Sequence, residues 1–157
     1  MQTFPHRYVV TAAGDTLDDI ELASGTLPPL RSAPPMEFDG PGDRWSPETF
    51  LVGAVAACYV LTFRAVARAS RVSWTWLRCD VSGTLERVDK APQFTGFDVR
   101  ARLSIPPTMD AEQARRALEK AESQCLISRS LKGTIHLAIA IDIDVVIEPE
   151  PVAGARS

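Results

Sequence analysis

The stretch "FLVGAVAACYVLTFRAVARAS", Phe50 to Ser70, is apolar on nearly every side. The residues before it, "RWSPE", are typical of a helix start. Ser46 can cap the N-terminus of the helix, and Pro47 suits the first helical position. Glu48 complements the positive end of the helix dipole. We therefore expect a central helix over 47–70. A helix without a polar face must be surrounded by protein, so we expect a sheet and a partner subunit to bury it.

Three strands are expected after the helix. The segment Trp74 to Leu85 leads through a turn near 89–92 into Phe97 to Ile105, where apolar and polar side chains alternate. Between the strands, "TMDAEQARRALEKAESQC" carries an apolar stripe at helical spacing and predicts an amphipathic helix that ends at Cys125. Alternation of period two predicts antiparallel strands with one buried face. The last strand places these side chains on one face: Ile135, Leu137, Ile139, Ile141, Ile143 and Val145.

The first 46 residues predict a hairpin and then a Pro-rich segment. The hairpin pairs Tyr8 to Thr11 with Leu17 to Leu22. The segment "LPPLRSAPPMEFDGPGDRWSP" is expected to be extended or looping chain, because proline lacks the N–H donor of a strand or helix. The whole chain is predicted to be one α+β domain, 1–157, in which 71–147 hold the strand pair, helix and final strand, and 148–157 form a flexible tail.

Composition narrows the class of protein. With 45% apolar and 24% charged residues and a net charge of -3, the chain is typical of a globular protein that binds neither nucleic acid nor an anionic membrane. The start "MQTFPHRYVV" lacks the features of a signal peptide. The longest uncharged run, Thr49 to Phe63, is 15 residues, fewer than the ~20 that span a bilayer. These features predict a cytoplasmic protein.

The three cysteines form no C-x-x-C pair and do not indicate a disulfide framework. His6 and His136 match no metal-ligand spacing, so neither a metal nor another cofactor is predicted. Cys79 lies on the apolar side of its strand and is interpreted as a core residue. Cys58 and Cys125, each considered alone, would also be interpreted as small buried side chains.

Two motifs change the interpretation of Cys58 and Cys125. Glu48, preceded by proline, lies ten positions before Cys58 across a run of small and apolar residues. Cys125 is followed by Ile127, Ser128 and Leu131 in the pattern Cys-x-[Val/Ile]-Ser-x-x-Leu. From Asp39 to Val145 the chain resembles the OsmC/Ohr family of thiol-dependent hydroperoxide reductases, and "EFDGPGD" also looks like the family's Phe-x-Gly approach to the helix.

The resemblance implies an intertwined homodimer, with long central helices packed between strongly curved antiparallel sheets and active sites at the subunit interface. It implies that Cys58 is the peroxidatic thiol and Cys125 the resolving thiol. An external dithiol, such as a lipoyl-type reductant, would reset the pair, and no cofactor is needed. Glu48 corresponds to a glutamate that holds an arginine near the thiolate. Such a cation is required because burial alone raises the pKa of a thiol.

The sequence departs from the family pattern at this arginine. The first hairpin turn reads "AAGDT", and the other family position holds Met36-Glu37. Arg7, Arg31 and Arg44 remain, and Arg44, nearest to the glutamate in sequence, is the candidate that stabilises the thiolate. Ten helical residues rise ~15 Å, so Glu48 cannot touch Cys58 if one regular helix contains both. Either the helix begins after Glu48, or the chain folds back, or the neighbouring subunit contributes.

Three functions follow as hypotheses. The first is a peroxidase, part of an antioxidant stress response, that reduces organic hydroperoxides through a Cys58 sulfenate and a Cys58–Cys125 disulfide. The second is a non-catalytic relative that binds a small apolar ligand at the dimer interface, or a slow redox sensor. The third is a partner-binding subunit that exposes "LPPLRSAPP" as a polyproline ligand.

Overall fold

The computed structural model describes residues 3–17 and 19–144, which form two compact units divided after Gly53. The predicted flexible tail, 148–157, and the last residue of the predicted final strand, Val145, lie outside the described residues. The interpretation of 1–157 as a single domain stays a prediction. Each unit is described by itself below.

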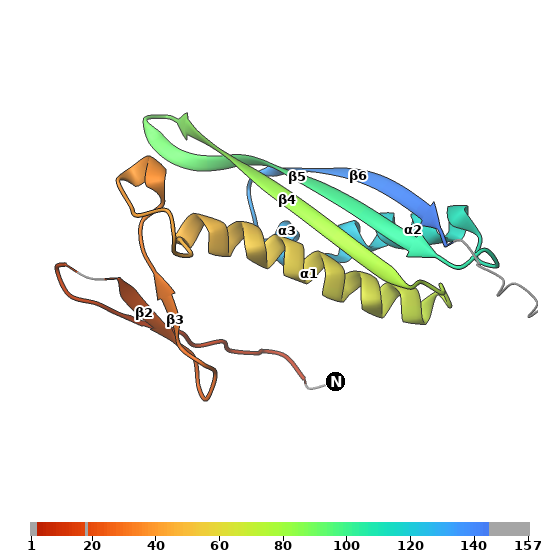
Figure 1. Ribbon diagram of the computed structural model, residues 1–157, viewed down its shortest axis with the longest axis horizontal. Helices are drawn as coiled ribbons and strands as arrows, with labels where there is room; N and C mark the ends of the chain where they lie inside the picture. Colours follow the sequence, from red (N-terminus) through yellow and green to blue (C-terminus); the bar gives the residue numbers. More distant parts are fainter. Residues whose placement is uncertain (1–2, 18, 145–157) are drawn as a thin grey trace, which may run out of the picture. The chain divides into compact units, whose positions relative to one another are not determined.

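The first unit contains a small antiparallel sheet of three strands, β1 (Thr11–Ala13), β2 (Ile20–Ala23) and β3 (Leu30–Ser32), in the order β1-β2-β3 (Figure 1). The β1–β2 pair is the predicted hairpin with shifted boundaries. Strand β3 was not predicted, because it lies inside the Pro-rich segment. Its three residues contain no proline, and the edge of a sheet tolerates prolines beside a strand.

A 3-10 turn, η1 (Met36–Phe38), leads to the long helix α1 (Pro47–Ala69). The helix start is stabilised by reciprocal hydrogen bonds: the Thr49 N–H donates to Ser46 Oγ at 3.2 Å, and the Ser46 N–H donates to Thr49 Oγ1 at 2.7 Å. This arrangement resembles a capping box, with threonine in place of the usual glutamate. The predicted long helix is confirmed, and it includes Glu48 in its first turn.

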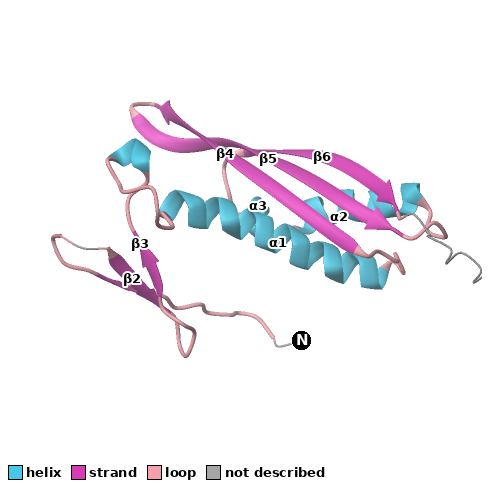
Figure 2. Ribbon diagram, in the orientation of Figure 1, coloured by secondary structure: helices cyan, strands magenta, loops and turns pink. Residues whose placement is uncertain are grey.

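The second unit packs helices against a larger sheet. Its elements are the part of α1 from Ala54 onward, β4 (Trp76–Val88), β5 (Ala91–Ile105), α2 (Ala111–Gln124), α3 (Leu126–Arg129) and β6 (Thr134–Ile143). The sheet order is β4-β5-β6, and α1 and α2 lie on one face of it (Figure 2). The Asp110 side chain caps α2 by accepting from the Gln113 N–H at 2.9 Å. This arrangement confirms the predicted α+β fold class.

Strand direction differs between the two pairs of this sheet. β4 and β5 are antiparallel and joined by a two-residue turn, Asp89-Lys90, with φ of 49° and 71°, as a type I′ turn requires. β5 and β6 are parallel, from Gly96 beside Thr134 to Ile105 beside Ile143, so the prediction of antiparallel strands is wrong for this pair. Alternation reports one buried face but not direction. The helical crossover through α2 and α3 makes a parallel pair.

Of the described residues, the large apolar side chains that are fully buried all belong to the second unit. They are Val55, Tyr59, Phe63, Phe97, Val99, Leu103, Ile105 and Leu118. Burying each such aliphatic or aromatic side chain stabilises the fold by about 1.5–3 kcal/mol. The first unit instead leaves Tyr8, Leu17 and Leu27 largely exposed. Hydrogen bonds and short strands, rather than a large apolar core, define the first unit.

Helix α1 is only partly covered by its own chain. Tyr59 and Phe63 are buried, whereas Leu61 is 60% exposed. By length and composition alone the helix could cross a membrane, since its most apolar window has a mean hydropathy of 1.9. The uncharged run counted in the sequence stops at Arg64, but the helix continues to Ala69. Core helices of soluble proteins pass the same test, so length and composition do not distinguish the two roles.

Candidate functional site

The second unit brings Cys58 and Cys125 together. Cys58 lies in the middle of α1 and is partly exposed. Cys125 is fully buried at the junction where α2 ends and α3 begins. The two thiols lie close enough for each to affect the pKa of the other, and both are free in this structure. Two cysteines 67 positions apart (125 minus 58) thus form one thiol pair.

Opposing effects act on the pKa of the Cys58 thiol. Burial raises the pKa and is the largest single effect. Hydrogen bonds from the Ile127 backbone, the Cys125 thiol, the Thr62 hydroxyl and the Leu126 backbone favour the thiolate, and together they lower the pKa below the ordinary value. The Thr62 hydroxyl lies 3.9 Å from the Cys58 sulfur, one helical turn away. Neutral hydrogen-bond donors therefore stabilise the Cys58 thiolate.

Cys125 is shifted in the opposite direction. Burial raises the pKa of its thiol, and the neighbouring Cys58 raises it further, although hydrogen bonds from the side chain and backbone of Ser128 oppose both effects. When the pair loses one proton, these shifts favour its loss from Cys58, while Cys125 keeps its own. This is the protonation that a nucleophilic first thiol and a waiting second thiol require.

Cys79 lies on β4 and shows no sign of activation. Burial, with smaller effects from Asp80 and Cys125, raises the pKa of its thiol to about 11. Nearby, the buried Tyr59 hydroxyl donates a hydrogen bond to the Leu118 carbonyl at 3.2 Å, and burial raises the pKa of Tyr59 above its usual range. These properties fit the interpretation of Cys79 as a core residue.

Glu48 is not a neighbour of Cys58 in its own chain. Because one regular helix contains both Glu48 and Cys58, the ten-residue rise along α1 separates them by ~15 Å, and the alternative in which the helix begins after Glu48 is wrong. The Glu48 Oε2 atom is buried, and it has no hydrogen-bond partner among the described residues. Glu48 therefore has a buried acceptor that its own surroundings leave unsatisfied.

Arg44, the candidate for the thiolate-stabilising cation, is engaged elsewhere in the first unit. Its Nε donates to Asp19 Oδ2 at 2.7 Å, and its Nη1 lies 2.9 Å from Asp43 Oδ2. Arg31 also approaches Asp19, with 3.8 Å between Nε and Oδ2. The causes that lower the pKa of Cys58 in the described part of the chain include no arginine or lysine.

Some groups around the thiol were not identified from the sequence. Thr62 could have been found, since it lies four residues after Cys58, and residues at this spacing share a helix face. The backbone N–H groups of Leu126 and Ile127 leave no signal in side-chain identity. Within residues 3–17 and 19–144, no group of three His, Cys, Asp or Glu side chains could hold a metal ion.

The fold and the site define an α+β protein that carries a pair of free thiols between a long helix and the end of a second helix. The chain belongs to the OsmC-like protein family, whose model matches residues 40–140. It is also 33% identical, over 114 residues, to the uncharacterized protein YmaD of Bacillus subtilis, a match that covers 69% of this chain and 75% of that one.

Solved structures share the fold at low identity. An OsmC-like protein of unknown function from Vibrio cholerae has a TM-score of 0.79 at 14% identity, covering 86% of this chain and 99% of that one. The organic hydroperoxide resistance protein OsmC from Legionella pneumophila has a TM-score of 0.69 at 21% identity, covering 88% and 98%. OhrB of Bacillus subtilis, an organic hydroperoxide resistance protein, has a TM-score of 0.63 at 18% identity, covering 87% and 98%.

Proposed function

We propose that this protein is a thiol-dependent peroxidase that reduces organic hydroperoxides to alcohols. The observation that supports the proposal is the proximity of Cys58, whose pKa is lowered, to Cys125, whose pKa is raised. Two members of the same fold carry organic hydroperoxide resistance in their names. We further propose a cytoplasmic location, as the sequence predicts.

The first step consumes one hydroperoxide. The Cys58 thiolate attacks the distal oxygen, the O–O bond breaks, and the departing alkoxide takes a proton to leave as the alcohol while Cys58 becomes a sulfenic acid. In the second step the Cys125 sulfur attacks the Cys58 sulfur. The S–O bond breaks, water leaves, and a disulfide forms. An external dithiol then exchanges with this disulfide, becomes oxidised itself, and restores both thiols.

A homodimer is part of the proposal. The exposed side of α1, which includes Leu61, and the exposed apolar side chains of the first unit need cover that one chain does not supply. Glu48, ~15 Å along the helix from Cys58 in its own chain, would meet the thiol site of the neighbouring subunit. Arg44 would stabilise the thiolate only after release from Asp19 and Asp43.

A non-catalytic relative or a slow redox sensor is the second candidate, favoured by the neutral environment of Cys58. In the described part of the chain, only neutral donors lower its pKa. A fast peroxidase requires that these neutral donors suffice to stabilise the Cys58 thiolate. The sensor would form the same disulfide slowly, and the non-catalytic protein would keep a protonated, unreactive Cys58.

The decisive experiment measures turnover and intact mass with cumene hydroperoxide and dihydrolipoamide. We expect Cys58→Ser to abolish turnover, and Cys79→Ser, the matched control, to retain it. One equivalent of hydroperoxide should lower the mass of the native chain by about two units, the two hydrogens lost on forming a disulfide. In Cys125→Ser, excess hydroperoxide should instead drive Cys58 to sulfinic acid. Full activity in Cys58→Ser would refute the mechanism.

A further inference from the structure

Cys125 is less accessible than Cys58, and this difference limits how an external dithiol can reduce a disulfide between them. The Cys125 side chain is 0% exposed, whereas Cys58 is partly exposed. Because Cys125 is buried by its own chain, a partner subunit cannot make it more accessible. An external thiolate must reach the sulfur that it attacks, so access governs thiol–disulfide exchange. Cys58 is therefore the sulfur that an external thiol can approach.

The backbone holds Cys125 in its buried position. The Cys125 N–H donates to the Glu122 carbonyl at 3.0 Å, and the Cys125 carbonyl accepts from the Arg129 N–H at 3.1 Å. These two bonds fix the junction between α2 and α3. Helix α2 is itself tied to α1, since the Tyr59 hydroxyl donates to the Leu118 carbonyl at 3.2 Å. Bringing the Cys125 sulfur to the surface would break contacts of this kind.

The chemistry of the leaving group opposes attack on Cys58. A thiol of lower pKa leaves faster, and the pKa of Cys58 is lowered while that of Cys125 is raised. Attack on Cys58 therefore expels the poorer leaving group. It also leaves a thiolate in a buried position, where an unassisted anion is costly. The departing Cys125 sulfur consequently needs a donor inside the second unit.

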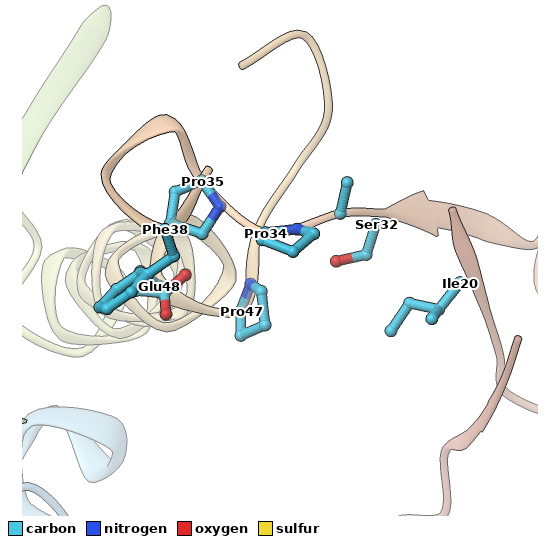
Figure 3. A pocket seen from close by; sticks show the side chains of 8 residues that line it. Ile20, Ser32, Pro34, Pro35, Phe38, Pro47 and Glu48 are labelled. Atoms are coloured by element: carbon cyan, nitrogen blue, oxygen red, sulfur yellow. The ribbon is translucent and has the colours of Figure 1, made fainter. Parts of the chain in front are cut away.

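Ser128 is placed to supply this donor. It is buried, with 6% exposure, and lies on α3 three residues after Cys125. Its side chain and its backbone both lower the pKa of Cys125, which means that they stabilise the thiolate. Among the described residues, the groups with the largest effects on Cys125 include no arginine, lysine or histidine. Glu48 is not among these groups either: it lines a pocket of the first unit with Phe38 and Pro47 (Figure 3).

We propose that the external dithiol attacks the Cys58 sulfur of the disulfide, and that Ser128 stabilises the Cys125 sulfur as it leaves. The inference rests on the proposed function, because it concerns the reduction of the proposed disulfide.

The reduction takes place in two exchanges. One thiolate of the dithiol bonds to the Cys58 sulfur, the Cys58–Cys125 bond breaks, and Cys125 leaves with the electron pair. The second thiolate of the dithiol then attacks the dithiol sulfur that is bound to Cys58. This releases the Cys58 thiolate and a cyclic disulfide. The protein sulfurs gain the two electrons that the dithiol loses. Of the two dithiol protons, one is taken up by Cys125 and the other by solvent.

The site of attack can be read from a trapped mixed disulfide. Diamide forms the disulfide without any need for peroxidase activity, and 2-mercaptoethanol is then added for seconds. After an acid quench, free thiols are alkylated in urea with N-ethylmaleimide. Trypsin places the three cysteines in separate peptides, 45–64, 79–87 and 121–129. We expect 2-mercaptoethanol on Cys58 about tenfold more often than on Cys125, because access decides which sulfur is attacked.

Ser128 is tested by single-turnover reduction of the diamide-formed disulfide with dihydrolipoamide. We expect Ser128→Ala to slow this step about fivefold or more, since a hydrogen bond to a charged group is lost. Ser128→Thr keeps the hydroxyl and should restore most of the rate. Ser123→Ala changes an exposed serine of α2 and is the matched control, with an unchanged rate. Consumption of the first equivalent of hydroperoxide should be unchanged in Ser128→Ala, whereas a merely structural defect would slow both steps.

Three results would overturn the inference: 2-mercaptoethanol on Cys125 as often as on Cys58, no Cys58–Cys125 disulfide with diamide, or reduction of Ser128→Ala at the native rate. Circular dichroism establishes that each variant is folded, and Ser128→Gly replaces Ser128→Ala if the latter does not fold. Failure of the proposed function is a separate result. A chain without hydroperoxide turnover would refute that function, while the disulfide made with diamide would still report which sulfur is attacked.

Discussion

Cys58 and Glu48 lie on the same helix, in different units, and their surroundings differ. The pKa of Cys58 is lowered by groups of its own unit, on α1, at Cys125 and on α3. The Glu48 Oε2 atom receives no hydrogen bond from the described residues. The second unit also has a large apolar core, whereas the first exposes most of its large apolar side chains. One chain thus supplies donors to Cys58, whereas the described residues supply none to Glu48 Oε2 and leave the first unit without a large apolar core.

The largest expected effect concerns packing. We expect Leu118→Ala, at a fully buried position of α2, to lower the free energy of unfolding by about 2–5 kcal/mol, because a cavity remains in the core of the second unit. Leu27→Ala, at an exposed position of the first unit, should change it by less than about 0.5 kcal/mol. Urea denaturation at one fixed chain concentration measures both. Equal effects would contradict the contrast between the units.

The next effect concerns the uncovered side of α1. Leu61→Asp should weaken the proposed dimer at least tenfold, since a charge would enter an apolar interface. Ala138→Asp, on the exposed face of β6, makes the same kind of change where no cover is expected. Sedimentation equilibrium across a concentration series gives both dissociation constants. An unchanged dissociation constant in Leu61→Asp would show that this side of α1 is not part of the interface.

The smallest effect concerns the thiolate. Alkylation of Cys58 should slow as pH falls through its pKa, because the reactive thiolate takes up a proton, and this should occur below the ordinary thiol value of 9.0. Thr62→Val removes one of the groups that favour the thiolate and should raise the Cys58 pKa slightly. Peptide mass spectrometry after iodoacetamide treatment follows each cysteine separately.

Cys79 is the internal control for this titration. Its pKa of about 11 keeps it protonated and slow to react at pH 8, where Cys58 should react first. If Cys79 reacts as fast as Cys58, the donors around Cys58 do not activate it. A Thr62→Val pKa equal to that of the native chain would assign the activation to Cys125 and the backbone groups of Leu126 and Ile127.

Periodicity and local chemistry were enough to predict α1, the β4–β5 hairpin and α2, because each depends on neighbours close in sequence. Ser46, Pro47 and Thr49 specify the start of α1 within a few residues. The same reasoning missed β3, whose pairing with β2 offsets the bias of the surrounding prolines. It also missed the direction of β6, which depends on the path through α2 and α3.

The sequence by itself determined which residues are the candidates for the chemistry, since the spacing of Glu48, Cys58 and the motif after Cys125 is visible in the chain. Only the tertiary structure decided what each of them meets. It put the Leu126 and Ile127 backbone beside the Cys58 sulfur, and among the residues that the structure describes it gave Glu48 Oε2 no donor. The physical reason is that hydrogen bonding and desolvation depend on atoms brought together from distant positions, and side-chain identity does not encode them locally.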